Sequence, residues 1–142
     1  MNLSLEDFWQ FSLITYADKQ NELLNWQDEH GANVNLALFC LYLAHHQVKL
    51  TTAQITKLHQ EVRLFSQQTT QKVRILRKEF KTLNSDIQHY NEIKQHLLDA
   101  ELLLEKQEQS VLFECFQKLP AVDKHSHSHN WQDYQTFLIN AQ

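Results

Sequence analysis

The sequence predicts an all-α protein that folds as a single-domain bundle of five to seven helices. The 142 residues include one glycine and one proline, whereas average usage is about 7% and 5%. The Asn-Gly and Asp-Gly pairs that favour tight β-hairpins do not occur in the sequence. Apolar residues recur at helical spacing, between side chains that cap helices well. A chain of this length can bury one substantial core.

The N-terminal region is expected to form two helices, over about residues 5–17 and 19–30. Ser4, with Asp7 three residues later, is typical of the polar pair that opens a helix. Gly31 can adopt the left-handed backbone conformation that closes a helix. The second helix should therefore end in a tight corner before the next one begins.

The next helix, over about residues 34–46, is predicted to be the buried centre of the bundle. Asn33 can cap its first turn through the side-chain oxygen. The nine residues from 36 to 44 are all apolar or aromatic, and a helix that is hydrophobic on every side is surrounded by others. Because a membrane span needs about 20 such residues, this run predicts a core helix and no membrane crossing.

Downstream, apolar stripes over residues 55–65 and 73–83 predict two helices with a break in the polar segment 66–71. Residues 84–85, Asn-Ser, predict the next turn. A long helix is expected over about residues 86–119, because proline follows and cannot continue it.

Three parts are therefore expected along the chain. Residues 1–120 form the helical bundle, residues 121–130 form a His-rich polar linker, and residues 131–142 form a short C-terminal helix. The aromatic side of that helix, with Trp131 and Phe137, should dock on the bundle.

The charge, the N-terminal residues and the cysteines of the chain indicate which partners and which cellular compartment to expect. A net charge of −4 and a pI near 6.1 give no bulk attraction to nucleic acid or to an anionic membrane. The N-terminus lacks the basic and apolar regions of a secretory signal. Cys40 and Cys115 have no Cys-x-x-Cys spacing and are expected to be buried, reduced thiols of a cytoplasmic protein.

Two stretches carry a resemblance: FWxFSLxxY over residues 8–16 and QDxxGxxVNLxLF over residues 27–39. They resemble a family of short, uncharacterised bacterial all-helical proteins classed as a domain of unknown function. The family also carries an Arg-rich helix followed by a Glu-bearing one, matched here by Arg74-x-x-Arg77 and Glu101-x-x-x-Glu105. The likeness covers most of residues 5–119 and implies an all-helical cytoplasmic protein without an assigned activity.

The long predicted helix places Glu101, Glu105 and Glu108 within its apolar stripe. Carboxylates in such a stripe must reach solvent, pair with cations or take up protons. A buried network with Arg74 or Arg77 is the favoured interpretation. A surface covered by a partner and a chemical site are the alternatives.

A polar pocket near the start of the central helix is a second hypothesis. Asn35 lies in the first turn of the most buried helix, so its amide needs hydrogen-bond partners, and Asp28 and His30 are the nearest in sequence. A small-molecule binding protein or enzyme would use this pocket and would contain at least two carboxylates of raised pKa. The candidate pocket residues are Asp28, His30, Asn35, Arg74, Glu101 and Glu105.

A basic stripe precedes the turn and consists of Arg74, Arg77, Lys78 and Lys81. It could bind nucleic acid or an acidic partner protein, but it lacks the interleaved aromatic residues that stack on bases. In an antiparallel hairpin, Arg77 would lie near Glu92, and Arg74 near Gln95 and Asp99. Charge matching within the chain is therefore the favoured interpretation.

Metal binding has one weak candidate, formed by His125, His127 and His129. Alternate residues of an extended segment project to one side and can share a transition metal, yet no thiolate accompanies them. No catalytic residue and no cofactor are predicted. The favoured function is a non-enzymatic cytoplasmic helical interaction module whose partner is an unknown protein or a second copy of the chain.

Overall fold

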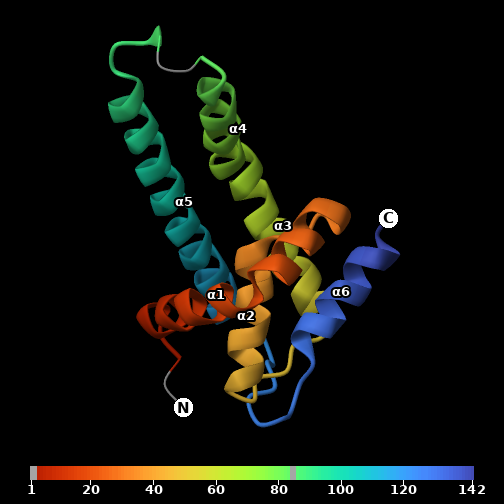
Figure 1. Cartoon of the computed structure of the whole chain (residues 1–142). Helices are drawn as coiled ribbons and strands as arrows, with labels where there is room; N and C mark the ends of the chain where they lie inside the picture. Colours follow the sequence, from red (N-terminus) through yellow and green to blue (C-terminus); the bar gives the residue numbers. More distant parts are fainter. Residues whose placement is uncertain (1–2, 84–85) are drawn as a thin grey trace.

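The computed structural model describes residues 3–83 and 86–142, and within these ranges the protein is a bundle of α-helices. The predicted all-α fold class is confirmed (Figure 1). None of the helices in the described ranges is long and apolar enough to cross a bilayer. The helices are α1 (Leu5–His30), α2 (Val34–His45), α3 (Thr52–Gln68), α4 (Thr70–Lys81), α5 (Tyr90–Lys118) and α6 (Asn130–Asn140).

The first two predicted helices are one helix with a kink. The Ser4 hydroxyl accepts a hydrogen bond from the Asp7 backbone N–H at 3.0 Å and opens α1. Lys19 leaves the helical region, with φ −113° and ψ 16°, but the helix resumes at once. The expected separation at residue 18 is therefore wrong, because neither glycine nor proline stands there to stop the helix. Gly31, with φ +72°, closes α1 as predicted.

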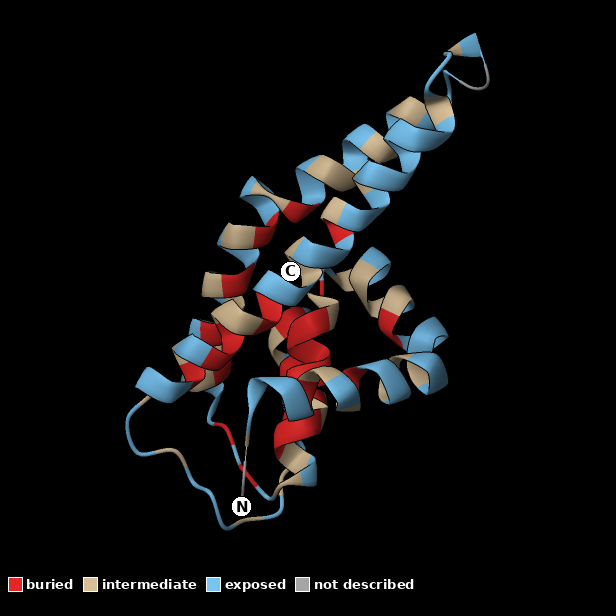
Figure 2. Ribbon diagram, turned by 90° about the vertical axis from the view of Figure 1, so that its left-hand side faces the viewer, coloured by how far each residue is buried: buried red, intermediate tan, exposed pale blue. Residues whose placement is uncertain are grey.

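Helix α2 is the buried centre, as predicted. The Asn33 side-chain oxygen accepts from the Leu36 N–H at 2.9 Å, which caps the first turn. Most of α2 is buried, and α1, α3, α5 and α6 pack around it. Figure 2 shows the buried residues concentrated on this helix and on the faces that surround it.

Helices α4 and α5 form a two-helix arm that projects from the rest of the bundle (Figure 1). The break predicted in the polar segment 66–71, between the apolar stripes over residues 55–65 and 73–83, is confirmed at Thr69. Helix α5 begins at Tyr90, four residues later than predicted, and the Tyr90 ring stacks on Phe80 at 5.1 Å between centroids. The turn predicted at residues 84–85 lies outside the described residues.

Helix α6 packs against α2 and α3, and Trp131, Tyr134 and Leu138 are buried. The segment before it, predicted as a polar linker, is attached to the loop that follows α2. The Lys49 N–H donates to the Asp123 carbonyl at 2.8 Å, and the Ser126 N–H donates to the Gln47 carbonyl at 3.0 Å.

Candidate functional site

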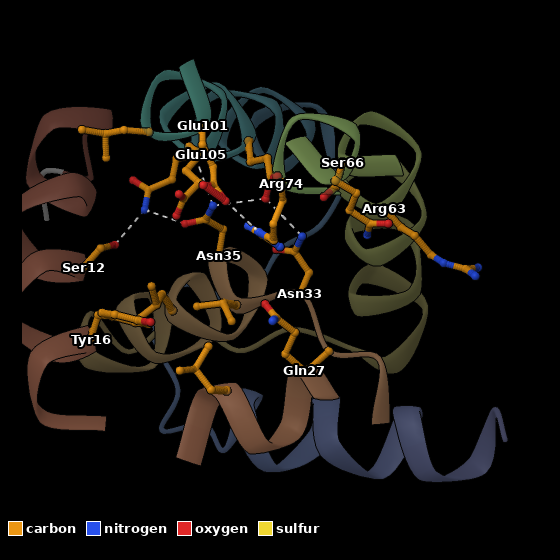
Figure 3. Close-up of a pocket in the computed structure, with 18 of the residues that line it drawn as sticks. Ser12, Tyr16, Gln27, Asn33, Asn35, Arg63, Ser66, Arg74, Glu101 and Glu105 are labelled. Atoms are coloured by element: carbon orange, nitrogen blue, oxygen red, sulfur yellow. Dashed lines mark hydrogen bonds and ion pairs between the residues drawn. The ribbon is translucent and has the colours of Figure 1, made fainter. Parts of the chain in front are cut away.

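A cavity of about 960 Å³ opens between α1, the start of α2, the junction of α3 with α4, and α5 (Figure 3). Its volume is that of a small-molecule site. Five of the six candidate pocket residues line it: Asp28, Asn35, Arg74, Glu101 and Glu105.

His30 does not line this cavity. Its ring packs on Trp26 at 4.3 Å between centroids, and its Nδ1 lies 3.4 Å from Gln142 Oε1, at the end of the chain. Asp28 and His30, the nearest candidates in sequence, are not the partners of the Asn35 amide. His30 ends α1 and contacts Gln142, which follows α6, whereas the Asn35 amide faces α5.

The Asn35 amide is satisfied entirely by α5. Its Nδ2 donates to the Glu105 carbonyl at 3.1 Å and to Glu108 Oε1 at 3.2 Å. Its Oδ1 accepts from Gln109 Nε2 at 3.0 Å, and the same Nε2 donates to Ser12 Oγ at 2.9 Å. These bonds fix α1, α2 and α5 to one another at the floor of the cavity.

Glu108 is a cavity residue that sequence reasoning left outside the candidate pocket. It is 3% exposed, and its Oε1 accepts from Asn33 Nδ2 at 3.1 Å as well as from Asn35. Both donors lie at the N-terminal end of α2, where the helix dipole favours a negative charge. A signal for Glu108 and Gln109 existed in the sequence, since they lie three and four residues after Glu105 on one face of a helix.

Glu101 lies between two arginines. Arg74 Nε donates to Oε1 at 2.9 Å and Arg77 Nε donates to Oε2 at 2.8 Å. Burial by itself would raise the pKa of Glu101, but the hydrogen bonds and charges of Arg77 and Arg74 outweigh it and leave that pKa below its ordinary value. The network with Arg74 or Arg77 that the sequence favoured for the carboxylates of the stripe is therefore present at Glu101, where both arginines are engaged, whereas Glu108 pairs with Asn33 and Asn35.

Both arginines reach further along α5 than the sequence predicted. Counting from the turn placed them near Glu92, Gln95 and Asp99, whereas both contact Glu101. Side chains of a helix lean toward its own N-terminus. In the antiparallel arm the arginines therefore lean toward the base and Glu101 leans toward the tip. Helix α5 also begins four residues later than the counted register assumed, and both effects favour contacts further along α5 than predicted.

Glu105 is half-buried in the same cavity, and its carboxylate makes no hydrogen bond or ion pair within the described part of the chain. Burial raises the pKa of Glu105, and the neighbouring charges of Glu101 and Glu108 add to this, while Arg74 and Arg77 oppose it. The hypothesis of two carboxylates with raised pKa is not met by this pair, since the pKa of Glu101 is lowered.

The predicted basic stripe does not form one basic surface. Arg74 and Arg77 line the cavity and are engaged by Glu101. Lys78 is exposed at the cavity rim, and Lys81 is exposed at the end of α4. Two of the four cations are therefore paired within the chain, both with the one carboxylate of Glu101.

The three histidines of the candidate metal segment, His125, His127 and His129, are all exposed. The intervening serines face the protein: Ser126 Oγ donates to Asp123 Oδ2 at 2.7 Å and Ser128 Oγ donates to the Val48 carbonyl at 2.9 Å. Across residues 3–83 and 86–142, no three His, Cys, Asp or Glu side chains are grouped so as to hold a metal ion.

The two cysteines are free thiols. Cys40 is buried as expected, and burial raises the pKa of its thiol. Cys115 is only half-buried, which corrects the expectation that both would be enclosed.

Comparison with protein families gives a match over residues 7–112 to a family model described as "Protein of unknown function (DUF2390)". The match runs from the first turn of α1 to most of α5, so it includes every cavity residue named above, whereas α6 lies beyond it. No match was found among curated proteins or among solved structures.

Proposed function

This chain belongs to the DUF2390 family of proteins of unknown function, so a proposed role rests on the surfaces of its own structure. We propose that it is a non-enzymatic helical interaction module that pairs with a second copy of itself through the arm formed by α4 and α5. The observation that carries this proposal is an apolar face on the arm, on the side away from the cavity.

This outer face is defined by helical geometry. Arg77 and Glu101 mark the line where α4 and α5 contact each other. At about 100° per residue, one side of that line holds cavity residues such as Arg74 and Glu105, and the other side is apolar. The outer face consists of Leu76, Ile93, Leu97, Ala100 and Leu104.

Exposure of this face supports a docking role. Leu76 is 51% exposed and Ile93 is 37% exposed, and Leu103 at the edge of the face is 65% exposed. The main packing partners of α4 are α3 and α5, and the tip of the arm stands clear of the other helices (Figure 1). A contiguous apolar patch on a projecting element is typical of a protein–protein contact.

Charge favours a second copy as the occupant. At about 100° per residue, Lys72 of α4 lies beside the outer face at one edge, and Glu92 and Asp99 of α5 lie beyond Leu103 at the other edge. A two-fold axis through the arm lays α4 of one copy along α5 of the other, so that opposite charges border the apolar contact. The two arms then form an intermolecular four-helix bundle, a geometry that buries such stripes well.

The free thiols of Cys40 and Cys115 support a reducing compartment as the place of action, and we propose the cytoplasm.

The proposal is tested by replacing two apolar residues of the outer face, Leu76→Asp with Ile93→Asp, and measuring mass by sedimentation equilibrium. Wild type should be a dimer at micromolar concentration. The double variant should dissociate at least about 100-fold more readily, since a two-fold dimer loses four apolar side chains and each contributes about 1.5 kcal/mol when it is fully buried.

The matched control is Ile14→Asp, because Ile14 is 76% exposed on α1 and outside the arm. This variant should remain dimeric. A monomeric wild type, or a double variant that dimerises as tightly as wild type, would show that the arm is not a self-association surface.

A further inference from the structure

Three carboxylates of α5 enter the cavity, and two of them have partners. Glu101 is held by two arginines and Glu108 by the amides of Asn33 and Asn35. Glu105 lies between them on the same helix face and lines the cavity. Its carboxylate is half-buried and without a partner among the described residues. A ligand that supplies a cation or a hydrogen-bond donor would satisfy it.

A second unpartnered group lies one turn further along α5. Gln109 is 1% exposed and lines the cavity, and its Oε1 has no hydrogen-bond partner. The orientation of this amide is fixed by its neighbours. Asn35 Nδ2 donates to α5, so Asn35 Oδ1 must accept, and Gln109 must present its Nε2 there. Gln109 Oε1 is therefore a buried acceptor without a donor, which is a costly arrangement. Because this atom has almost no exposed surface, a ligand donor reaches it only when the side chains around it shift.

Glu105 and Gln109 can serve one ligand group together. They are four residues apart on α5, which places their Cβ atoms about 5–6 Å from each other. An ammonium group has three donors and a positive charge. It could donate to both oxygens at once and neutralise Glu105.

Arg74 supplies the opposite charge. Its Nε is engaged by Glu101, and its terminal nitrogens make no hydrogen bond within the described residues. The positive charge of Arg74 acts to lower the pKa of both Glu105 and Tyr16. Even so, no nitrogen of Arg74 lies within 4.0 Å of a Glu105 carboxylate oxygen, so the two do not form an ion pair. Figure 3 shows Arg74, Glu101, Glu105 and Asn35 gathered at the centre of the cavity, with Arg63 extending away from them.

We propose that the cavity binds a small zwitterion of the α-amino-acid type. The ammonium lies between the Glu105 carboxylate and Gln109 Oε1, and the ligand carboxylate lies on the terminal nitrogens of Arg74. The side chain of the ligand contacts the remaining wall, where Trp9, Leu13 and Leu102 line the cavity. This site faces away from the outer face of the arm, so the inference does not depend on self-association.

The test begins with wild-type protein and each common L-α-amino acid at millimolar concentration, followed by saturation-transfer NMR and titration calorimetry. At least one amino acid should bind. Its analogue lacking the amino group and its analogue lacking the carboxylate should each bind about 10-fold more weakly or worse, since each loses charge-assisted hydrogen bonds.

The decisive variant is Glu105→Gln, which keeps the size of the side chain and removes its charge. Affinity for the bound amino acid should fall about 10-fold or more. Glu114→Gln makes the same change at an exposed position of α5 that does not line this cavity, and it should leave affinity unchanged.

The inference is overturned if no amino acid binds the wild type, if the deaminated analogue binds as tightly as its parent, or if Glu105→Gln binds like wild type. The analogue comparison uses wild type alone, so it decides the question even if Glu105→Gln fails to fold. The Leu76→Asp, Ile93→Asp variant should bind as wild type does, which separates this site from the pairing surface.

Discussion

Glu101 and Glu105 stand one turn apart on α5, and their pKa values shift in opposite directions. The difference comes from what faces each carboxylate. Two guanidinium groups form ion pairs with Glu101. Glu105 lies beside two other carboxylates, and the charges of the arginines act on it without a hydrogen bond or an ion pair. One helix face therefore holds one carboxylate that stabilises the fold when ionised and one that opposes it.

Replacement of Glu105 by Gln should stabilise the protein at neutral pH. The pKa of Glu105 in the folded state is above its ordinary value of 4.5. Its favourable contribution is therefore complete below that ordinary value and is lost as pH rises through the folded pKa. Urea unfolding should show Glu105→Gln more stable than wild type at neutral pH, with a difference that shrinks toward zero in acid. A less stable variant at neutral pH would contradict the assignment.

Replacement of Glu101 by Gln should have the opposite effect. Removing one partner leaves two guanidinium groups without their counter-charge, and breaking a buried ion pair costs about 3 kcal/mol. The lower end of that range applies because both arginine side chains keep some contact with water. Since the pKa of Glu101 is lowered, the loss should be full above its ordinary range and fade as pH falls through the folded pKa. Urea unfolding across the same pH series measures it.

At the scale of elements, the corner between α1 and α2 positions the cavity. Gly31 ends α1 in the left-handed region, and two residues later Asn33 caps α2 and donates to Glu108. The N-terminus of α2, with its positive dipole, therefore faces the middle of α5 through the side chains of Asn33 and Asn35. A change in this corner alters where α2 begins and hence where Asn35 meets α5.

Gly31→Ala should cost about 1 kcal/mol, because a Cβ is disfavoured in the left-handed region. The cost is confined to the backbone, since a Cβ at Gly31 would meet no atom within 4 Å. Gly31→Asn should cost less, as asparagine tolerates this conformation. Urea unfolding of the two variants gives the ranking, and an equal or larger loss for Asn would show that something other than backbone conformation is limiting.

At the scale of the whole molecule, Tyr134 joins three helices. Its hydroxyl accepts from the Asn33 N–H at 3.0 Å and lies 2.8 Å from His59 Nδ1. Burial lowers the pKa of His59, with the Arg63 charge adding to this, so the neutral imidazole is favoured and its Nδ1 can accept from the hydroxyl. Helix α6 is therefore tied by one side chain to the corner that positions the cavity and to α3.

Tyr134→Phe should reduce stability by about 1–2 kcal/mol, because it leaves a buried N–H and a half-buried imidazole without their partner. Tyr42→Phe is the matched control. The Tyr42 hydroxyl donates to Asp7 at 3.0 Å, and the Asp7 side chain is 53% exposed, so water can replace this bond. Thermal and urea unfolding should show the smaller loss for Tyr42→Phe. The reverse order would mean that Tyr134 contributes mainly by packing.

The sequence by itself determined where most helices begin and end and which one is central. Gly31, Asn33 and the apolar run of α2 act within one or two turns, and such local signals depend on no other part of the chain. The interruption near Lys19 was predicted, but not that α1 continues through it, since a polar stretch without glycine or proline does not show whether a helix ends or only bends.

Only the tertiary structure decided how the polar residues are paired. The sequence predicted one candidate pocket of Asp28, His30, Asn35, Arg74, Glu101 and Glu105, of which His30 does not line the cavity. It did not predict that Glu108 and Gln109 would satisfy Asn35, or that Glu105 would be left without a partner among the described residues. Those outcomes depend on how far two helices slide past each other and on the lean of long side chains across the gap. If one helix were displaced by one turn along the other, a different carboxylate would face the arginines. The sequence of a single helix does not determine that displacement.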